Sequence, residues 1–165
     1  MDFELKRWKE KYLPALKDFA SDAGVSTQMP DSFPHSGSDA EKYIRQRLLA
    51  DDEKELCRAV IIDGKPVGAI EIIAGAGISR RTASLRFWLA EEYRGQSVMS
   101  RALAKLSETA FERLDVLRID AEVPACNIAA RCALNNAGFS LEGTLARRAF
   151  IKGRAEDVCI YAILK

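Results

Sequence analysis

The chain has 165 residues, of which 48% are hydrophobic and 30% charged, a composition typical of one folded domain that excludes a disordered chain. Its 25 basic and 24 acidic residues leave a net charge of +1, which excludes a general electrostatic attraction to nucleic acid or to an anionic membrane. No apolar run approaches the roughly 20 residues that span a membrane, and the amino-terminal residues carry no signal-peptide pattern. We expect a single domain over residues 1–165, located in the cytoplasm.

The amino-terminal third is predicted to contain short elements around a long loop. The expected elements are a strand over 3–7, a helix over 12–20, and a helix over 40–50 that Ser38 or Asp39 caps. Residues 23–39 alternate Pro and Gly with Ser, Thr and Asp, which is typical of a loop, and a loop of this length often has a function. We expect it to line a substrate entrance.

The middle of the chain changes from a strand pattern to a helix pattern. The runs 57–62 and 67–73 are rich in β-formers and are joined at Asp63-Gly64, where glycine supplies a positive φ, so they predict a hairpin. The alternating run 82–89 predicts a further strand. From Val98 onward apolar residues follow helical spacing.

The carboxyl-terminal third predicts a strand, a helix and a second hairpin. The run 118–123 alternates until Pro124, after which Asn127 is a suitable N-cap and Gly138 a suitable residue to follow the helix. The last expected elements are strands over 139–151 and 158–164, joined by a turn at Lys152-Gly153-Arg154. The whole order is β-α-α-β-β-β-α-β-α-β-β, which predicts a mixed α/β fold with helices on both faces of the sheet.

Cysteine and histidine do not indicate a metal site. His35 is the one histidine, without His or Cys neighbours at ligand spacing, so we expect no metal and no triad that needs a second histidine. The four cysteines have no C-x-x-C pair, and we expect reduced, mostly buried thiols: Cys57, Cys126, Cys132 and Cys159.

The segment 87–101, FWLAEEYRGQSVMSR, predicts an anion-binding site. A strand, a short turn that contains glycine and the first turn of a helix bring backbone N–H groups together at the positive end of the helix dipole. Arg94 and Arg101 add positive charge. An ordinary turn between a strand and a helix would have a similar sequence.

Three segments resemble, in their order and spacing, the GNAT superfamily of N-acyltransferases, and its RimJ/RimL-type branch in particular. They are FWLAEEYRGQSVMSRAL, IDAEVPACNIAARCALNNAGF and LEGTLARRAFIKGRAEDVCIYAIL. Weaker similarity extends back to the opening FELKRW, so the resemblance covers nearly the whole chain. It implies a central, mostly antiparallel and splayed sheet of about seven strands, and acetyl-CoA as the acyl donor.

The resemblance also implies where coenzyme A binds. The pyrophosphate is expected on the backbone amides of residues 94–100, and the pantetheine arm beside Trp88 and Leu89, where the sheet splays open. Asn127 matches an asparagine that contacts coenzyme A in the family. The expected cofactor-binding residues are Trp88, Leu89, Arg94, Gly95, Gln96, Ser97, Val98, Met99, Ser100 and Asn127.

Several positions depart from the family pattern. Ser97 replaces a glycine, and a positive φ there would cost about 1 kcal/mol or more. We expect instead that this position only has to be small, because serine suits the start of a helix. Ala130 replaces a serine, Leu134 a tyrosine, and Ala149 a glutamate that members of the family use.

The transfer of an acetyl group from a thioester to an amine nevertheless needs few catalytic groups. A thiolate leaves readily because a thiol has a pKa of about 8.5, so a general acid is dispensable. The backbone N–H near Leu89 is our candidate oxyanion donor. The resemblance implies Glu122 as the first candidate for a base acting through water, because it lies where RimI-like members carry their catalytic glutamate. Glu122 is equally explained as a solvent-facing charge, and Glu71 is the second candidate.

The sequence thus predicts an acetyl-CoA-dependent N-acetyltransferase that works by direct transfer to a primary amine. The acceptor is either a protein N-terminus or a small amine or amino acid, and the chain is a monomer or a homodimer. The alternative is a non-catalytic module of the same fold that binds acyl-CoA or a partner protein. Four aromatic residues are expected in the core or at the rim, with the acceptor pocket as the other option: Trp8, Trp88, Tyr93 and Phe150.

Overall fold

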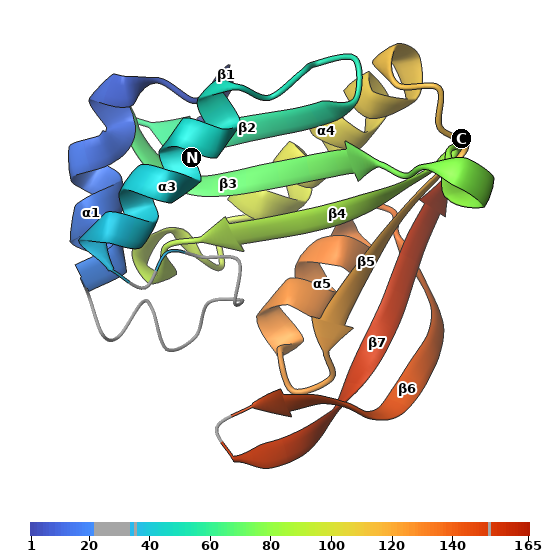
Figure 1. Cartoon of the computed structure of the whole chain (residues 1–165). Coiled ribbons are helices and arrows are strands. Elements are labelled where there is room, and N and C mark those ends of the chain that lie inside the picture. Colours follow the sequence, from blue (N-terminus) through green and yellow to red (C-terminus); the bar gives the residue numbers. More distant parts are fainter. Residues whose placement is uncertain (22–33, 35, 152) are drawn as a thin grey trace. The chain divides into compact units, whose positions relative to one another are not determined.

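The computed structural model describes residues 1–21, 34, 36–151 and 153–165 (Figure 1). The strands are β1 (Glu4–Arg7), β2 (Glu55–Ile62), β3 (Lys65–Ala74), β4 (Thr82–Leu89), β5 (Arg118–Pro124), β6 (Ser140–Ile151) and β7 (Arg154–Leu164). The α-helices are α1 (Leu13–Ser21), α3 (Gly37–Leu48), α4 (Val98–Arg113) and α5 (Ile128–Asn136). This order confirms the predicted one. His35, Lys152 and most of the loop 23–39 lie outside the described residues.

The strands form a mixed, mostly antiparallel sheet, as predicted. In the described part of the chain it has seven strands in the order β1-β2-β3-β4-β5-β7-β6. The pairs β1–β2, β5–β7 and β6–β7 are antiparallel, whereas β4 and β5 are parallel. The parallel pairing joins Thr82–Ser84 to Arg118–Asp120 and ends before the carboxyl-terminal half of β4.

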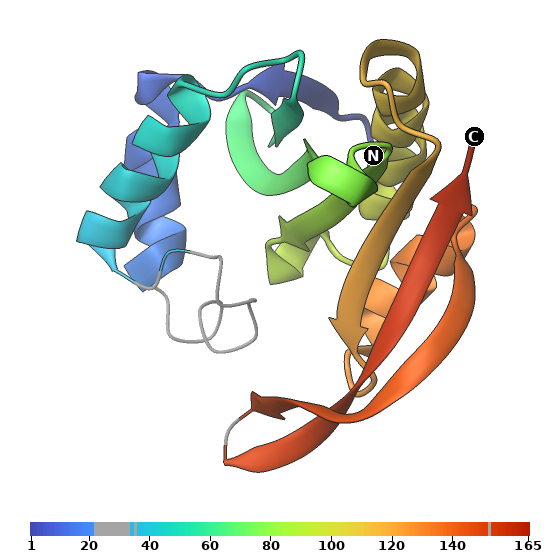
Figure 2. The same ribbon diagram turned by 45° about the vertical axis from the view of Figure 1, so that its right-hand side comes forward.

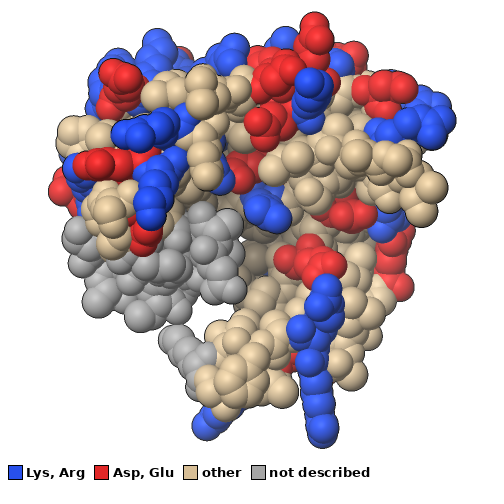
Figure 3. All heavy atoms as spheres, in the orientation of Figure 1, with Lys and Arg blue, Asp and Glu red and all other residues tan. Residues whose placement is uncertain are grey.

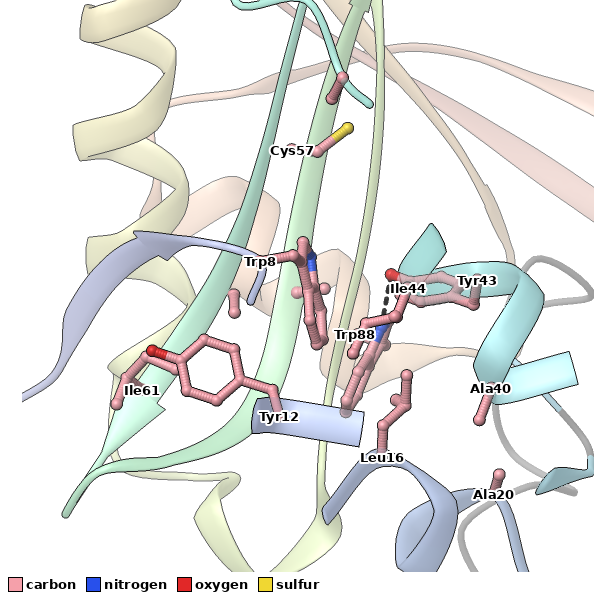
Figure 4. Packing of buried hydrophobic residues seen from close by; sticks show 13 residues of the cluster. Trp8, Tyr12, Leu16, Ala20, Ala40, Tyr43, Ile44, Cys57, Ile61 and Trp88 are labelled. Atoms are coloured by element: carbon pink, nitrogen blue, oxygen red, sulfur yellow. Dashed lines mark hydrogen bonds between the residues drawn. The ribbon is translucent and has the colours of Figure 1, made fainter. Parts of the chain in front are cut away.

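The described residues divide into two compact units. Unit 1 comprises Met1–Glu71 and Phe87–Val98, and unit 2 comprises Ile72–Arg86 and Met99–Lys165. The core of unit 1 lies between α1, α3 and one face of β2, β3 and β4 (Figure 4). Its aromatic rings meet edge to face, with Trp8 against both Tyr12 and Tyr43. The prediction of one domain over 1–165 stays a prediction.

Two chain reversals that the sequence predicts are present in the structure. Asp63 and Gly64 both have positive φ, 48° and 77°, which is the conformation of a type I′ hairpin turn. Helix α5 ends at Asn136 and is followed by its C-cap Ala137 and by Gly138, φ 93°, and the Phe139 N–H donates to the Leu134 carbonyl. This is a Schellman ending, in which glycine takes the left-handed position.

The predicted cap of the second helix is wrong by two or three residues. Helix α3 is capped by Ser36, whose Oγ accepts a hydrogen bond from the Asp39 N–H at 3.1 Å. Ser36 has the extended backbone that an N-cap needs, φ −150° and ψ 165°, so the helix begins at Gly37 rather than Ala40. The Ser36 hydroxyl also donates to Asp39 Oδ2, which makes the two residues a small capping pair.

Unit 2 contains the long β6–β7 hairpin, and Figures 1 and 2 show α5 along one side of it. Strand β6 is irregular: its register shifts between Leu145 and Ala149, and Arg147 within that bulge has φ 52°. The Arg147 N–H donates to Asp157 Oδ1 at 2.8 Å, so a side chain from β7 supports the left-handed residue. Phe150, near the tip, is 77% exposed.

The cysteines are less buried than predicted. Cys57 and Cys159 are buried, but Cys126 and Cys132 are exposed because the segment around Asn127 and the outer face of α5 face solvent. Burial, together with the negative charge of Glu71, raises the pKa of the Cys57 thiol to about 12, so it is protonated at physiological pH.

The surface charge is mixed. Lys, Arg, Asp and Glu side chains are intermingled over the face drawn in Figure 3, in keeping with the net charge of +1. Among the described helices, none is both long and apolar enough to cross a membrane. Nor do the described residues bring three or more His, Cys, Asp or Glu side chains together as a metal site.

A forked pair of hydrogen bonds from Arg118 joins β5 to β6 across the intervening strand β7 and predicts a pH dependence. Arg118 on β5 donates through Nη1 and Nη2 to both carboxylate oxygens of Glu142 on β6, at 2.7 and 2.6 Å. The hydrogen bonds from Arg118 hold the pKa of Glu142 below its ordinary value. A carboxyl group of this kind stabilises the folded state above its unfolded pKa, and that contribution disappears as pH falls through the folded pKa.

We therefore expect Glu142→Gln to lower the melting temperature near neutral pH, and this deficit to shrink as the pH falls through the folded pKa, because Glu142 is then protonated in both states. Thermal unfolding across this range measures the difference. Glu112→Gln, at an exposed position on α4, is the control and should leave the melting temperature unchanged at both neutral and acidic pH. An equal deficit at both pH values would show that Glu142 contributes through packing rather than charge.

Candidate functional site

The predicted strand, turn and helix are present, with a backbone suited to binding an anion. After β4, a short 3-10 helix (Glu91–Tyr93) leads to a turn in which Gly95 has φ 74° and Ser97 φ 55°. Helix α4, of 16 residues, begins at Val98. Its first turn contains no acidic residue, and the exposed Arg101 lies there. The amides of a first helical turn have no acceptor within the helix, so this end favours a negative ligand.

The backbone of Leu89 is turned away from β3. The Ala90 N–H donates to the Val67 carbonyl at 2.8 Å, so residue 90 faces β3. Because backbone groups alternate along a strand, the N–H and C=O of Leu89 point to the opposite side. The Leu89 carbonyl accepts a hydrogen bond from Arg94 Nε at 3.0 Å, which ties the end of β4 to the turn.

Trp88, by the same alternation, directs its backbone toward β3 and its side chain into the core. A Cβ on Gly68 of β3 would lie only 2.6 Å from the Trp88 carbonyl oxygen, so the two strands approach closely at this glycine. The Trp88 indole is 5% exposed. Of the two residues predicted to flank the pantetheine arm, Leu89 is therefore the one with outward-facing backbone groups.

The prediction that position 97 only has to be small is wrong. Ser97 has φ 55°, in the left-handed region that glycine adopts freely and other residues adopt at a cost of about 1–2 kcal/mol. Gly95, two residues earlier in the same turn, also has a left-handed backbone, with φ 74°. The helix-start preference of serine assumes an ordinary N-cap backbone, which residue 97 does not have.

Glu71, the second candidate base, lies inside unit 1 with three polar neighbours. It is 4% exposed, and its Oε1 accepts hydrogen bonds from Tyr43 Oη at 2.7 Å and Arg47 Nε at 2.8 Å. Arg47 Nη2 lies 2.7 Å from the same oxygen. Tyr43 Oη also accepts from Trp88 Nε1 at 3.3 Å, and Figure 4 shows the two rings directed toward each other. The structure thus brings Glu71 and Trp88 together.

Sequence reasoning missed Tyr43 and Arg47 as members of this cluster. Their spacing of four residues places them on one face of the second helix, which the sequence does show. Their partners lie on strands 24 to 45 residues further along the chain, and helical periodicity carries no information about such contacts.

Unit 2 contains Glu122, Asn127 and three of the positions that depart from the family pattern: Ala130, Leu134 and Ala149. Glu122 is exposed on β5, opposite Ile160 of β7. Asn127 caps α5 as predicted, since its Oδ1 accepts from the Ala130 N–H at 3.1 Å. Leu134 is fully buried, so the position that matches the family's tyrosine carries a core leucine.

Ala149, the position that matches a glutamate of the family, pairs across the hairpin with Glu156. Residues directly opposite in an antiparallel pair share one face of the sheet. The remaining aromatic candidates differ: Trp8 is a core residue like Trp88, Tyr93 is half-buried, and Phe150 faces solvent.

The mixed sheet and the left-handed turn before α4 define an α/β protein that can hold an anionic ligand at the start of that helix. The model of the GNAT acetyltransferase domain matches residues 2–140. The chain belongs to the GNAT acetyltransferase family, and it is accordingly an acyltransferase.

Curated relatives carry acetyltransferase names, and a solved structure shares the fold. YdaF of Bacillus subtilis (strain 168), named as a ribosomal N-acetyltransferase, is 25% identical over 81% of this chain and 75% of its own length. The ribosomal-protein-serine acetyltransferase of Escherichia coli (strain K12) is 34% identical over 50% of this chain and 46% of its own length. A structure of RimL, the ribosomal L7/L12 alpha-N-protein acetyltransferase, in complex with coenzyme A superposes with a TM-score of 0.85. It is 23% identical and covers 98% of this chain and 93% of its own, so it shows the fold.

The backbone of Ser97 predicts the effect of restoring glycine. Ser97→Gly relieves about 1–2 kcal/mol of left-handed strain and loses about 0.5–1 kcal/mol to the greater chain entropy of glycine. We expect the free energy of unfolding to rise by up to roughly 1.5 kcal/mol in denaturant titrations. Ser97→Ala, which keeps the strain and removes only the hydroxyl, is the matched control. If alanine stabilised the chain as much as glycine, the backbone explanation would be wrong.

Proposed function

We propose that the chain transfers the acetyl group of acetyl-CoA directly to a primary amine, with both substrates bound at once. The observation that carries this proposal is the outward-facing backbone of Leu89, which Arg94 ties to the left-handed turn that leads into α4. The turn suits the phosphates of the donor, and the Leu89 N–H suits the oxygen of its thioester. The RimL structure that this fold matches was solved with coenzyme A.

The donor would be held chiefly by main-chain groups. The amides of residues 95–100 would bind the pyrophosphate, whereas the Arg94 N–H, which was also expected to bind it, already donates to the Glu91 carbonyl at 3.0 Å. The side chains of Arg94 and Arg101 would add positive charge. Arg94 already holds the Leu89 carbonyl, so its proposed role combines contact with the donor and support of the strand end. The other residues proposed to bind the donor are those expected from the sequence. Asn127 would contact it through Nδ2, because its Oδ1 accepts the hydrogen bond of the helix cap.

The reaction needs a neutral amine, a place for negative charge on oxygen and a leaving thiolate. Acetyl-CoA supplies the activated carbonyl, whose C–S bond breaks as the C–N bond to the amine forms. The Leu89 N–H would stabilise the negative oxygen, and Glu122 would accept the proton of the ammonium group through water. Position 134 is a buried leucine and offers no acid, and a thiol with a pKa of about 8.5 leaves without one.

The acceptor that we favour is the N-terminus of a ribosomal protein. Support comes from the relatives, of which YdaF and the Escherichia coli protein are both named for ribosomal acetylation. A small amine or amino acid is the other acceptor class. A non-catalytic acyl-CoA-binding module is the competing function, since Ala130 and Leu134 lack the hydroxyl groups that family members use.

Calorimetry with acetyl-CoA and a thiol-release assay over a panel of amines test the function. We expect binding that weakens as salt rises, because the ligand is anionic and the turn is exposed, and transfer to peptides that carry a free N-terminus. Binding without transfer to any amine or ribosomal protein would favour the non-catalytic module. Failure to bind acetyl-CoA would overturn the proposal.

Glu122→Gln tests the proposed base. General base catalysis typically contributes 10²–10⁴-fold, so we expect kcat to fall by at least about 10-fold with unchanged affinity for acetyl-CoA. The loss should shrink at high pH, where the amine is already neutral. Glu108→Gln, an exposed carboxylate on α4, is the control. If the two variants behaved alike, Glu122 would be a solvated surface charge.

A further inference from the structure

We propose that Glu71 is a positioning residue for acetyl transfer: through Tyr43 it holds the Trp88 indole and thereby the backbone of β4 at Leu89. The inference rests on the proposed function, because it concerns the strand end at which the acyl donor would bind. It assigns to Glu71 a role other than that of a base.

The geometry is a continuous chain of hydrogen bonds within unit 1. Trp88 Nε1 donates to Tyr43 Oη at 3.3 Å, and Tyr43 Oη donates to Glu71 Oε1 at 2.7 Å. Burial raises the pKa of the Tyr43 phenol well above its ordinary value, and the Glu71 charge adds to this, so the phenol keeps its proton. The direction of the chain is therefore fixed, with the carboxylate as the final acceptor.

Arg47 holds the carboxylate in place. Two guanidinium nitrogens, Nε and Nη2, lie 2.8 and 2.7 Å from Glu71 Oε1, and Arg47 Cζ lies 3.6 Å from the centre of the Tyr43 ring. Oε1 thus faces three donors from two residues of α3. An oxygen that is buried and already accepts in this way is poorly placed to take a proton from a substrate, but well placed to orient a phenol.

The indole transmits this constraint to the end of β4. Trp88 is confined on its other sides, by Gly68 behind its carbonyl and by the Phe19 ring of α1, whose centroid lies 6.2 Å away. Leu89 follows directly, with its carbonyl held by Arg94. A tilt of the indole therefore rotates the peptide that carries the Leu89 N–H, and a misplacement of about 1 Å can reduce the rate by 10²-fold.

Tyr43→Phe tests the proposal with minimal change of shape, because it removes one oxygen and leaves the ion pair between Glu71 and Arg47 intact. In the ligand-free protein we expect the NMR signal of the Trp88 indole N–H to shift. With substrates we expect kcat to fall roughly 10-fold. Tyr12→Phe is the matched control, since Tyr12 is buried in the same core and its hydroxyl is not part of this chain of hydrogen bonds. It should leave both quantities unchanged.

Glu71→Gln, alone and combined with Tyr43→Phe, separates positioning from base catalysis. If Glu71 acts through Tyr43, glutamine lowers kcat in the wild-type background, has little further effect beside Tyr43→Phe, and leaves the shape of the pH–rate profile unchanged. An effect that persists in the double variant, or a lost acidic limb of the profile, would overturn the proposal in favour of a base.

The outcomes distinguish this inference from the proposed function. A wild-type chain that does not bind acetyl-CoA overturns the proposed function. A wild-type chain that binds and transfers, with Tyr43→Phe equal to Tyr12→Phe in kcat and in the indole signal, overturns only the role of Glu71. Should Tyr43→Phe fail to fold, Trp88→Phe provides the same kinetic comparison, because it removes the indole donor from the other end.

Discussion

Glu71 places a carboxylate inside unit 1, where it is buried on strand β3. A buried charge is stable only where hydrogen-bonding or oppositely charged partners compensate for the water that it loses. Arg47 supplies the opposite charge and Tyr43 a further donor, both from α3, so the carboxylate fixes how that helix lies on the sheet. Removing one partner of such a buried ion pair destabilises the fold by far more than the net contribution of the pair, because the remaining charge is left without compensation. The aromatic core around Trp8, Tyr43 and Trp88 is arranged about this one polar cluster.

A second constraint is backbone conformation at the turn before α4. Gly95 and Ser97 both adopt positive φ, and only the first is a glycine. Strained residues of this kind persist where the surroundings determine them, and they are concentrated at binding sites. Here the strain sets the direction from which α4 begins, and with it the direction in which the first-turn amides point. Arg94 connects this turn to the Leu89 carbonyl, so the strand end and the helix start are shaped together.

The chemistry that the family performs explains why the chain can lack several side chains. Thioester aminolysis needs orientation and a donor for negative charge more than it needs acids, and a backbone N–H provides such a donor without any particular side chain. A reaction that needs so few catalytic side chains is compatible with Ala130 and with the buried Leu134. The position of the backbone donor, which Glu71 is proposed to control from a distance, then affects the rate more than it would in an enzyme with a dedicated acid and base.

The sequence by itself determined those features that depend on neighbours along the chain. Four such features were predicted correctly: the Asp63-Gly64 turn, the Asn127 cap, the Gly138 ending, and the order of the strands and helices along the chain. They follow from local backbone preferences and from the hydrophobic period. Only the tertiary structure decided that Ser97 is left-handed, that Cys126 and Cys132 are exposed, and that Glu71 meets Tyr43, Arg47 and, through Tyr43, Trp88. These depend on contacts between residues far apart in sequence, and no local preference specifies which strand a helix face will cover or which strain the packing will impose.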